Sequence, residues 1–138
     1  MSRSPTPSMQ EQFLHVPIEW AFEAFTNPQH LAGWLCDGAL VLPQRGGTYE
    51  LRFGVGDDEV SVIGQVQRWE PPAGLELTWP GGESLELDLA PGLGGTDTRL
   101  KVSPGTGDAT VGPGGRRINE IWDGALDALA RYFGSLQR

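Results

Sequence analysis

Few side chains in this sequence have the chemistry needed for catalysis or metal binding, and they lie far apart along the chain. The histidines are His15 and His30, and the single cysteine is Cys36. Metal sites built from these residue types usually show a short spacing such as CxxC or HxxxH, and neither occurs. A cysteine nucleophile also needs a general base beside it. We therefore predict no metal, no cofactor and no catalytic residue, and we interpret Cys36 as structural.

Two glycine-rich stretches, residues 92–95 and 112–115, have the composition of loops that bind phosphate groups. A nucleotide-binding loop also requires a defined pattern, such as a P-loop or a Rossmann fingerprint. Neither pattern occurs, and the G-x-S-x-G motif of a serine nucleophile is absent as well. The first stretch lies between two predicted strands and the second precedes a predicted helix, so we interpret both as turn and cap sequences.

The large aromatic residues carry more information about function. Several are predicted on inward-facing positions, where plain core packing is the simpler interpretation. Small residues on neighbouring inward positions would leave space, and a largely apolar cavity with a few polar groups is the usual small-molecule site. Tyr49 is the polar candidate that alternation points inward. Candidate ligand-binding residues are Trp34, Tyr49, Phe53, Gly64, Trp79, Trp122 and Ala125.

The elements that must position these residues begin with a sheet. Apolar residues alternate with polar ones, as in the sequence Tyr49, Glu50, Leu51. That period of two predicts one buried face and one solvated face, which is typical of an antiparallel sheet. The 20 glycines and 11 prolines of the chain supply the turns between the alternating runs. We expect strands at residues 9–16, 39–42, 48–53, 59–69, 75–79, 85–89 and 96–102.

Helices are expected on both sides of this strand region. Pro17 precedes a short amphipathic helix from Ile18, and Asn27 and Pro28 have the residue types of a cap and a first helical position for a second helix over 28–35. A last helix is expected from Pro113, with an apolar stripe roughly five turns long that must lie on the inner face of the sheet. Its stripe consists of Ile118, Trp122, Ala125, Leu126, Leu129, Phe133 and Leu136. The predicted fold class is α+β, with a curved antiparallel sheet of six to seven strands around a long C-terminal helix.

Length and charge limit the classes of protein that fit. The 138 residues are about one domain's worth, and we expect a disordered leader over residues 1–8 and a domain over residues 9–138. The net charge of −8 disfavours nucleic acid as a partner. We expect no membrane span, because no run approaches 18 apolar residues. One cysteine and the lack of a signal peptide indicate a cytoplasmic protein.

The order of these elements is the helix-grip arrangement, and individual segments match a known family. The matching segments are Gly46-Gly47-Thr48-Tyr49-Glu50-Leu51, Glu70-Pro71-Pro72 with Leu75 to Trp79, Gly94-Gly95-Thr96 with Leu100, and Trp122 with Leu126 and Leu129. With these segments in this order and spacing over residues 9–136, the chain resembles the activator-of-Hsp90-ATPase-like branch of the START-like superfamily, which includes the polyketide cyclase/dehydrase and Bet v 1-like proteins.

The resemblance implies a protein that binds a hydrophobic or amphipathic small molecule in an apolar cavity between the sheet and the C-terminal helix. Two alternatives stay open. The first is an enzyme of the cyclase or hydrolase type on the same fold, which would need an acid–base pair inside the cavity. The second is a protein-binding module of the Hsp90-activator type, which would need an exposed apolar patch. The oligomeric state also stays open, with a homodimer among the options.

Overall fold

The computed structural model describes residues 8–54, 56–79, 82–103 and 121–136. The expected leader over residues 1–8 lies, apart from Ser8, outside the described residues. The expected start of the last helix at Pro113, with Ile118 of its stripe, also lies outside them.

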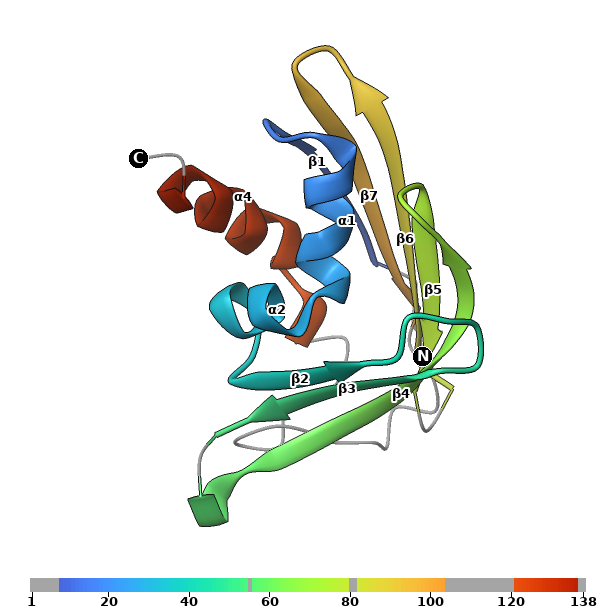
Figure 1. Cartoon of the computed structure of the whole chain (residues 1–138), viewed down its shortest axis with the longest axis vertical. Helices are drawn as coiled ribbons and strands as arrows, with labels where there is room; N and C mark the ends of the chain where they lie inside the picture. The colour runs from blue at the N-terminus through green and yellow to red at the C-terminus, as the bar shows by residue number, and fades with distance from the viewer. Residues whose placement is uncertain (1–7, 55, 80–81, 104–120, 137–138) are drawn as a thin grey trace, which may run out of the picture.

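A single bent antiparallel sheet forms one side of the molecule (Figure 1). Its seven strands follow the order β1-β7-β6-β5-β4-β3-β2, so the first strand closes against the last and β2 forms the opposite edge. The strands are β1 (Ser8–Leu14), β2 (Gly38–Val41), β3 (Thr48–Phe53), β4 (Val60–Glu70), β5 (Gly74–Thr78), β6 (Ser84–Gly92) and β7 (Gly95–Ser103).

The alternation in the sequence is reproduced as alternation of burial. On β3 every second residue is buried, with Tyr49, Leu51 and Phe53 facing inward. The register pairs Tyr49 with Gly64 of β4 and Leu51 with Val62, so inward residues of adjacent strands form continuous rows. The predicted strands are confirmed, with ends that differ by one to three residues except for β3, whose predicted range of 48–53 matches.

Three helices and a short 3-10 turn complete the described elements. They are α1 (Ile18–Thr26), α2 (Pro28–Trp34), η1 (Gly56–Asp58) and α4 (Ala125–Leu136). The predicted start of α2 is confirmed, because the Asn27 side chain accepts a hydrogen bond from the Gln29 N–H at 3.0 Å and Pro28 occupies the first turn. Pro17 stands at the N-cap position of α1, one residue before the position that its ring geometry favours.

The helices lie together on the concave side of the sheet, in the angle between its two halves (Figure 1). Helix α1 packs on β6 and β7, and α4 packs on β1 and against α2. The apolar stripe of α4 supplies Leu126, Leu129 and Phe133 to the core, all of them buried. Burial of this stripe is what holds the helix to the sheet. None of the described helices has the length and hydropathy to cross a membrane.

The helical backbone is interrupted just before α4, and a side chain from β1 supplies hydrogen bonds at the interruption. Asp123 and Gly124 form a turn, with Gly124 at a φ of 70° that favours glycine. In a continuous helix the Leu126 N–H would donate to the Trp122 carbonyl. Instead, the Nε2 of Gln10 donates to that carbonyl at 2.7 Å, and the Oε1 of Gln10 accepts from the Leu126 N–H at 3.3 Å. Gln10 therefore replaces one helical hydrogen bond with two that tie the helix to the sheet.

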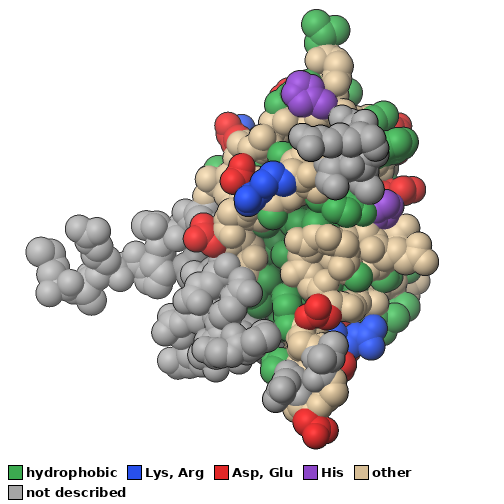
Figure 2. Space-filling model, turned by 90° about the vertical axis from the view of Figure 1, so that its left-hand side faces the viewer, with side chains coloured by type: hydrophobic (Ala, Val, Ile, Leu, Met, Phe, Trp, Pro, Cys, Tyr) green, Lys and Arg blue, Asp and Glu red, His purple; other side chains and the backbone are tan. Residues whose placement is uncertain are grey.

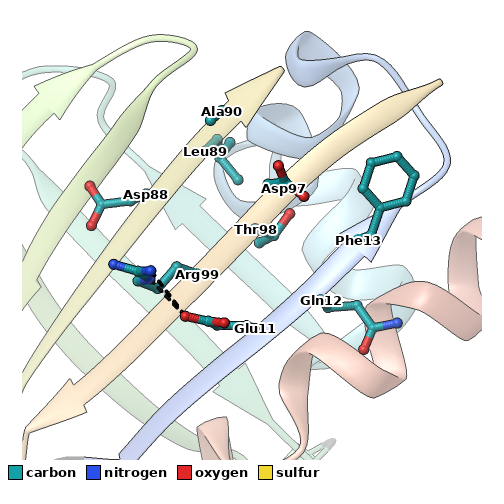
Figure 3. A pocket seen from close by; sticks show the side chains of 9 residues that line it. All are labelled: Glu11, Gln12, Phe13, Asp88, Leu89, Ala90, Asp97, Thr98 and Arg99. Carbon is teal, nitrogen blue, oxygen red and sulfur yellow. Dashed lines mark hydrogen bonds and ion pairs between the residues drawn. The ribbon is translucent and has the colours of Figure 1, made fainter. Parts of the chain in front are cut away.

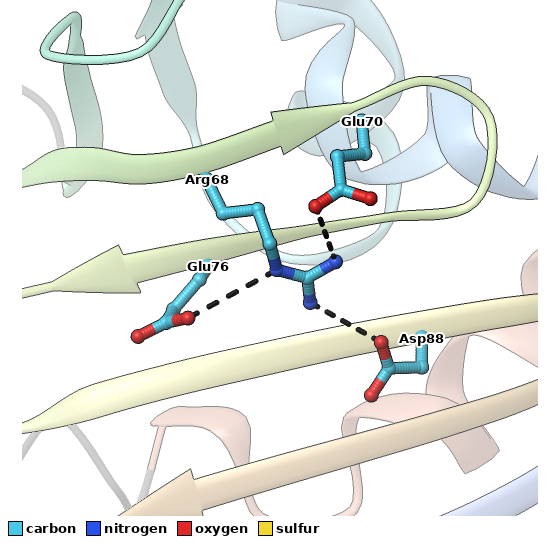
Figure 4. A network of polar contacts seen from close by, with 4 residues as sticks. All are labelled: Arg68, Glu70, Glu76 and Asp88. Atoms are coloured by element: carbon cyan, nitrogen blue, oxygen red, sulfur yellow. Dashed lines mark hydrogen bonds and ion pairs between the residues drawn. The ribbon is translucent and has the colours of Figure 1, made fainter.

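The outer face of the sheet carries paired charges. Arg68 of β4 lies between three carboxylates, with nitrogen–oxygen distances of 3.5 Å to Glu70, 3.9 Å to Glu76 and 3.2 Å to Asp88 (Figure 4). These residues come from three adjacent strands, so one guanidinium bridges β4, β5 and β6. Exposed ion pairs of this kind each contribute at most about 1 kcal/mol. The network therefore shapes the solvated face without defining a site.

Candidate functional site

A continuous row of aromatic rings crosses the interior between the sheet and the helices. Tyr49 packs edge-on against Trp79 with ring centroids 5.9 Å apart, and Trp79 lies 6.4 Å from Trp122. Trp122 stacks on Phe25 at 6.4 Å, and Phe25 packs edge-on against Trp34 at 5.3 Å. We call Tyr49, Trp79, Trp122, Phe25 and Trp34 the aromatic row. It brings together four of the predicted site residues through Phe25, which sequence reasoning placed on a helix face but not in the site.

Each ring of the row is placed by a different element. Tyr49 points inward from β3, and Trp79 follows the last residue of β5 on the inward parity of Leu75 and Leu77. Trp122 precedes α4, where Gln10 holds its carbonyl. Because these elements are distant in sequence, the row can form only when the sheet has bent around the helices.

The polar atoms of the two rings that end the row, Trp34 and Tyr49, have hydrogen-bond partners. The Trp34 Nε1–H donates to the Ala24 carbonyl at 2.9 Å, which pins α2 to α1. The Tyr49 hydroxyl donates to the Phe25 carbonyl, which pins β3 to the end of α1. Burial, with a smaller contribution from nearby Cys36, raises the pKa of Tyr49 well above its ordinary value of 10.0. Both groups therefore serve the packing of the helices and are not free to bind a ligand.

The two tryptophans in the middle of the row have polar atoms without partners among the described residues. The Nε1–H groups of Trp79 and Trp122 are buried, and neither has a hydrogen-bond acceptor within the described part of the chain. Trp79 is 4% exposed and Trp122 is fully buried. A buried donor without a partner costs about 1–3 kcal/mol, and most buried polar groups in folded proteins avoid that cost.

The remaining predicted site residues are Gly64, Phe53 and Ala125, and Gly64 lies beside this row. Trp79 lies directly over Gly64, because a Cβ added to Gly64 would lie 2.5 Å from the Trp79 ring. The space that Gly64 was expected to leave is therefore occupied by the indole. Ala125 is buried at the start of α4, and Phe53 is buried at the end of β3.

Sequence reasoning missed a buried carboxyl group, that of Glu83. The turn after Trp79 was expected to keep Glu83 outside the strand, yet the Trp79 N–H donates to the Glu83 carbonyl at 2.9 Å and so extends the β5–β6 ladder. Glu83 then shares the inward parity of Leu85 and is 4% exposed. Its Oε2 has no hydrogen-bond partner among the residues described. The signal in the sequence was this parity, two residues before Leu85.

Two further buried side-chain atoms lack a hydrogen bond in the described residues. One is the Thr98 hydroxyl of β7, and the other is the Arg52 Nε. The Arg52 Nε lies 3.6 Å from a Glu50 carboxylate oxygen, so its charge is partly compensated. The three other unmatched atoms differ from both, because they belong to neighbouring residues: Trp79 adjoins Trp122 and Glu83.

Cys36 has the environment of a structural cysteine. Its Sγ is buried and donates to the Gly38 carbonyl at 3.1 Å and the Leu31 carbonyl at 3.5 Å. Burial raises the pKa of the Cys36 thiol above its ordinary value of 9.0. A nucleophilic cysteine needs the opposite shift, because the thiolate is the reactive form. This geometry supports the structural interpretation of Cys36.

The outer face has a shallow hollow of about 590 Å³ between β1, β7 and β6 (Figure 3). Its charged side chains include Glu11, Asp88, Asp97 and Arg99, and Arg99 is paired with Glu11 at 3.0 Å. These four side chains are exposed and already solvated or paired. Thr98 also lines the hollow and has a buried hydroxyl without a hydrogen bond in the described residues, but the hollow has no group of neighbouring unmatched atoms such as Trp79 forms with Trp122 and Glu83.

The seven-stranded antiparallel sheet, bent around a C-terminal helix with two short helices after its first strand, defines a helix-grip α+β protein. The family model described as "Activator of Hsp90 ATPase homolog 1-like protein" matches residues 15–134, so the chain belongs to this family. The resemblance seen in the sequence is thereby confirmed.

Solved structures agree on the fold. The AHSA1-like protein from Aeromonas hydrophila is 20% identical with a TM-score of 0.79, over 96% of this chain and 94% of that one. Protein NE0264 from Nitrosomonas europaea is 17% identical with a TM-score of 0.74, over 94% of each chain. CalU16 from Micromonospora echinospora is 19% identical with a TM-score of 0.65, over 91% of this chain and 74% of that one. At these identities the likeness shows the fold alone. No curated protein matches the sequence.

Proposed function

We propose that this protein binds an apolar or amphipathic small molecule on the concave side of the sheet, where Trp79 and Trp122 meet. The observation that carries the proposal is the pair of buried indole N–H groups without acceptors in the described residues. A ligand oxygen at this position would supply the missing acceptor and remove an energetic cost from both side chains. The surrounding rings would supply the apolar contact that ligand sites usually have.

Figure 2 supports an approach from the helical side. Hydrophobic side chains are visible there in a band at the centre of the face, with Asp and Glu side chains around it. An amphipathic molecule would meet apolar surface flanked by polar groups, which is the usual arrangement at the mouth of a ligand site.

The two alternative functions have less support. An enzyme would need a convergent acid–base pair. The Tyr49 hydroxyl and the Cys36 thiol, which could partner the Glu83 carboxyl in such a pair, already donate to backbone carbonyls. A protein-binding module would need a contiguous apolar patch. Leu40 and Ile63 are exposed on the outer face, but the register places Glu50 between them.

The proposal is tested with a panel of fatty acids, aromatic compounds and polyketide-like compounds. A ligand at this position should quench or shift tryptophan emission. It should also stabilise the protein by about 2.7 kcal/mol at a hundredfold excess over its dissociation constant, which raises the melting temperature. Trp20 is 54% exposed on α1 and provides the matched control. Trp20→Phe should keep the emission change, whereas Trp122→Phe should lose most of it.

The result that would contradict the proposal is a panel without effect on emission or melting temperature. An emission change that disappears in Trp20→Phe and persists in Trp122→Phe would place the ligand elsewhere. In either case a search for protein partners becomes the better experiment.

A further inference from the structure

Glu83 and Trp79 form the last inward-facing pair of the β5–β6 hairpin. The pairs below them are Thr78 with Ser84 and Leu77 with Leu85, and the backbone hydrogen bond from Trp79 to Glu83 continues this register. Side chains that face each other across antiparallel strands have Cβ atoms about 4.5–5.5 Å apart. The Glu83 side chain therefore leaves the sheet beside the Trp79 indole, and neither the Glu83 Oε2 nor the Trp79 Nε1–H has a hydrogen-bond partner in the described chain.

The Trp79 N–H points away from β4, the strand over which the indole lies. The ring atoms closest to Gly64 of β4 are Cε3 and Cζ3, which lie on the edge of the indole opposite Nε1. The Nε1–H is thus directed away from Gly64. Trp122 approaches the same indole at an interplanar angle of 38° and brings a second unmatched N–H. Trp79 therefore adjoins two residues, Glu83 and Trp122, that carry one unmatched acceptor and one further unmatched donor.

We infer that the ligand carries a hydroxyl group, which donates its proton to the Glu83 carboxylate and accepts a hydrogen bond from the Trp79 indole. This inference rests on the proposed function and specifies the ligand that the same site would take. An alcohol or phenol oxygen is both a donor and an acceptor, so one atom can serve both side chains. The Trp122 N–H can donate a hydrogen bond to a second oxygen of the same ligand.

Other ligand groups match this set of atoms less well. A ligand carboxylate would be repelled by Glu83 in a protein whose net charge is already −8. A ketone or ether would satisfy the indoles but leave the buried carboxylate without a donor. An ammonium group would satisfy Glu83, but it has no acceptor for the indole N–H groups. A hydroxyl group on an apolar body meets all of these requirements.

The experiment uses probes of similar shape that differ in one polar group. The probes are 4-butylphenol, which donates and accepts; 4-butylanisole, which only accepts; butylbenzene, which does neither; and 4-butylbenzylamine, which is an ammonium ion at neutral pH. Affinities are measured by calorimetry on the full chain. The phenol should bind at least about tenfold more tightly than the anisole, since a hydrogen bond to a charged group is stronger than a neutral one. The anisole should bind about threefold more tightly than butylbenzene.

Two conservative variants assign these differences to residues. Glu83→Gln should reduce the preference for phenol over anisole to about twofold, with little change in the affinity for butylbenzene. Trp79→Phe should weaken the phenol and the anisole by about threefold to tenfold and leave their ratio nearly unchanged. Arg99→Gln, in the outer hollow, should alter none of the affinities. Melting temperatures of the unliganded variants show that each one is folded.

The outcomes separate the inference from the function on which it rests. Equal binding of phenol, anisole and butylbenzene would overturn the hydroxyl inference and leave the apolar ligand site intact. Tightest binding of the ammonium probe would show that Glu83 recognises a cation instead. Failure of all four probes to bind or to raise the melting temperature would overturn both.

Discussion

The ends and the middle of the aromatic row contain similar side chains in opposite states. At the two ends the Trp34 N–H and the Tyr49 hydroxyl donate to the carbonyls of Ala24 and Phe25. In the middle the N–H groups of Trp79 and Trp122 have no acceptor in the described residues. The difference separates two uses of an inward aromatic residue. A matched polar atom ties elements together, whereas an unmatched one is available to a ligand.

This comparison also explains why burial alone does not identify a site. Tyr49 and Trp122 are both fully buried and both lie in the row. They differ in whether their polar atoms are used by the fold. The predictions below test that difference through stability and pH dependence, from the largest expected effect to the smallest.

Trp122→Ala should have the largest effect, because Trp122 contacts rings on both sides of the row. We expect a loss of about 3–5 kcal/mol in the free energy of unfolding, from lost burial and the cavity that remains. Urea denaturation measures this loss. A loss below about 1 kcal/mol would mean that the row does not hold the last helix to the sheet.

Tyr49→Phe removes the hydroxyl that donates to the Phe25 carbonyl and keeps the ring. It should lower the free energy of unfolding at neutral pH by about 1–3 kcal/mol, because the buried Phe25 carbonyl loses its donor.

The same variant should change the response to alkaline pH. The pKa of Tyr49 is raised in the folded state, so the folded protein retains a proton that the unfolded chain releases. The stability that this residue contributes is therefore fully present below about pH 10 and is lost as the pH rises further. The difference between the wild type and Tyr49→Phe should narrow between roughly pH 10 and 11. A difference that stays constant over this range would contradict the assignment.

Gly64→Ala tests whether the Trp79 ring fills the space over β4. The added methyl group would lie 2.5 Å from the ring and 2.9 Å from the Thr78 carbonyl, so we expect a cost of about 1–3 kcal/mol from overpacking. Gly134→Ala is the matched control. Gly134 lies in α4 with open space around its Cβ position, and alanine there should stabilise the helix by up to about 1 kcal/mol. Equal effects at the two sites would show that Trp79 moves freely.

Glu83→Gln should have a smaller effect and the opposite sign. Glutamine keeps the volume of the side chain and removes a buried charge that lacks a partner in the described residues. We therefore expect the unliganded variant to be more stable by about 0.5–1 kcal/mol, as often found when a site residue is replaced. Thermal unfolding without ligand measures it. A destabilised variant would mean that the carboxylate already has a partner that stabilises it.

Most of the fold could be predicted from the sequence, because its determinants are local. Alternation predicted which face of each strand is buried, as at Tyr49 to Phe53. The residue type at Asn27 predicted the N-cap of α2. The break at Gly124 was not expected, although an Asp-Gly pair is a common turn signal. The apolar stripe continues across this break, because Gln10 supplies the hydrogen bonds that the backbone gives up. A contact of this kind between distant residues has no local signal.

The candidate site was predicted less completely. Strand alternation correctly placed Tyr49 and Trp79 on the inward side, and the helical stripe did the same for Trp122. Neither pattern could show which of their polar atoms had found hydrogen-bond partners. Glu83 was missed because a glycine turn was expected to end the strand, while the hairpin continues by one more pair. Gly64 was expected to leave space, and only the three-dimensional arrangement shows the Trp79 ring lying over it.

The hydrogen bonds of the Gln10 side chain also determine when β1 can take its place during synthesis of the chain. Its two hydrogen bonds join positions separated by 112 and 116 residues, and among the described strands β1 pairs with β7 alone. Contacts between such distant positions form late, because a long loop must close before they contribute stability. A ribosome releases β1 long before residue 126 has been made. Strand β1 is therefore made before the other described strands and is among the last of them to take its place in the sheet.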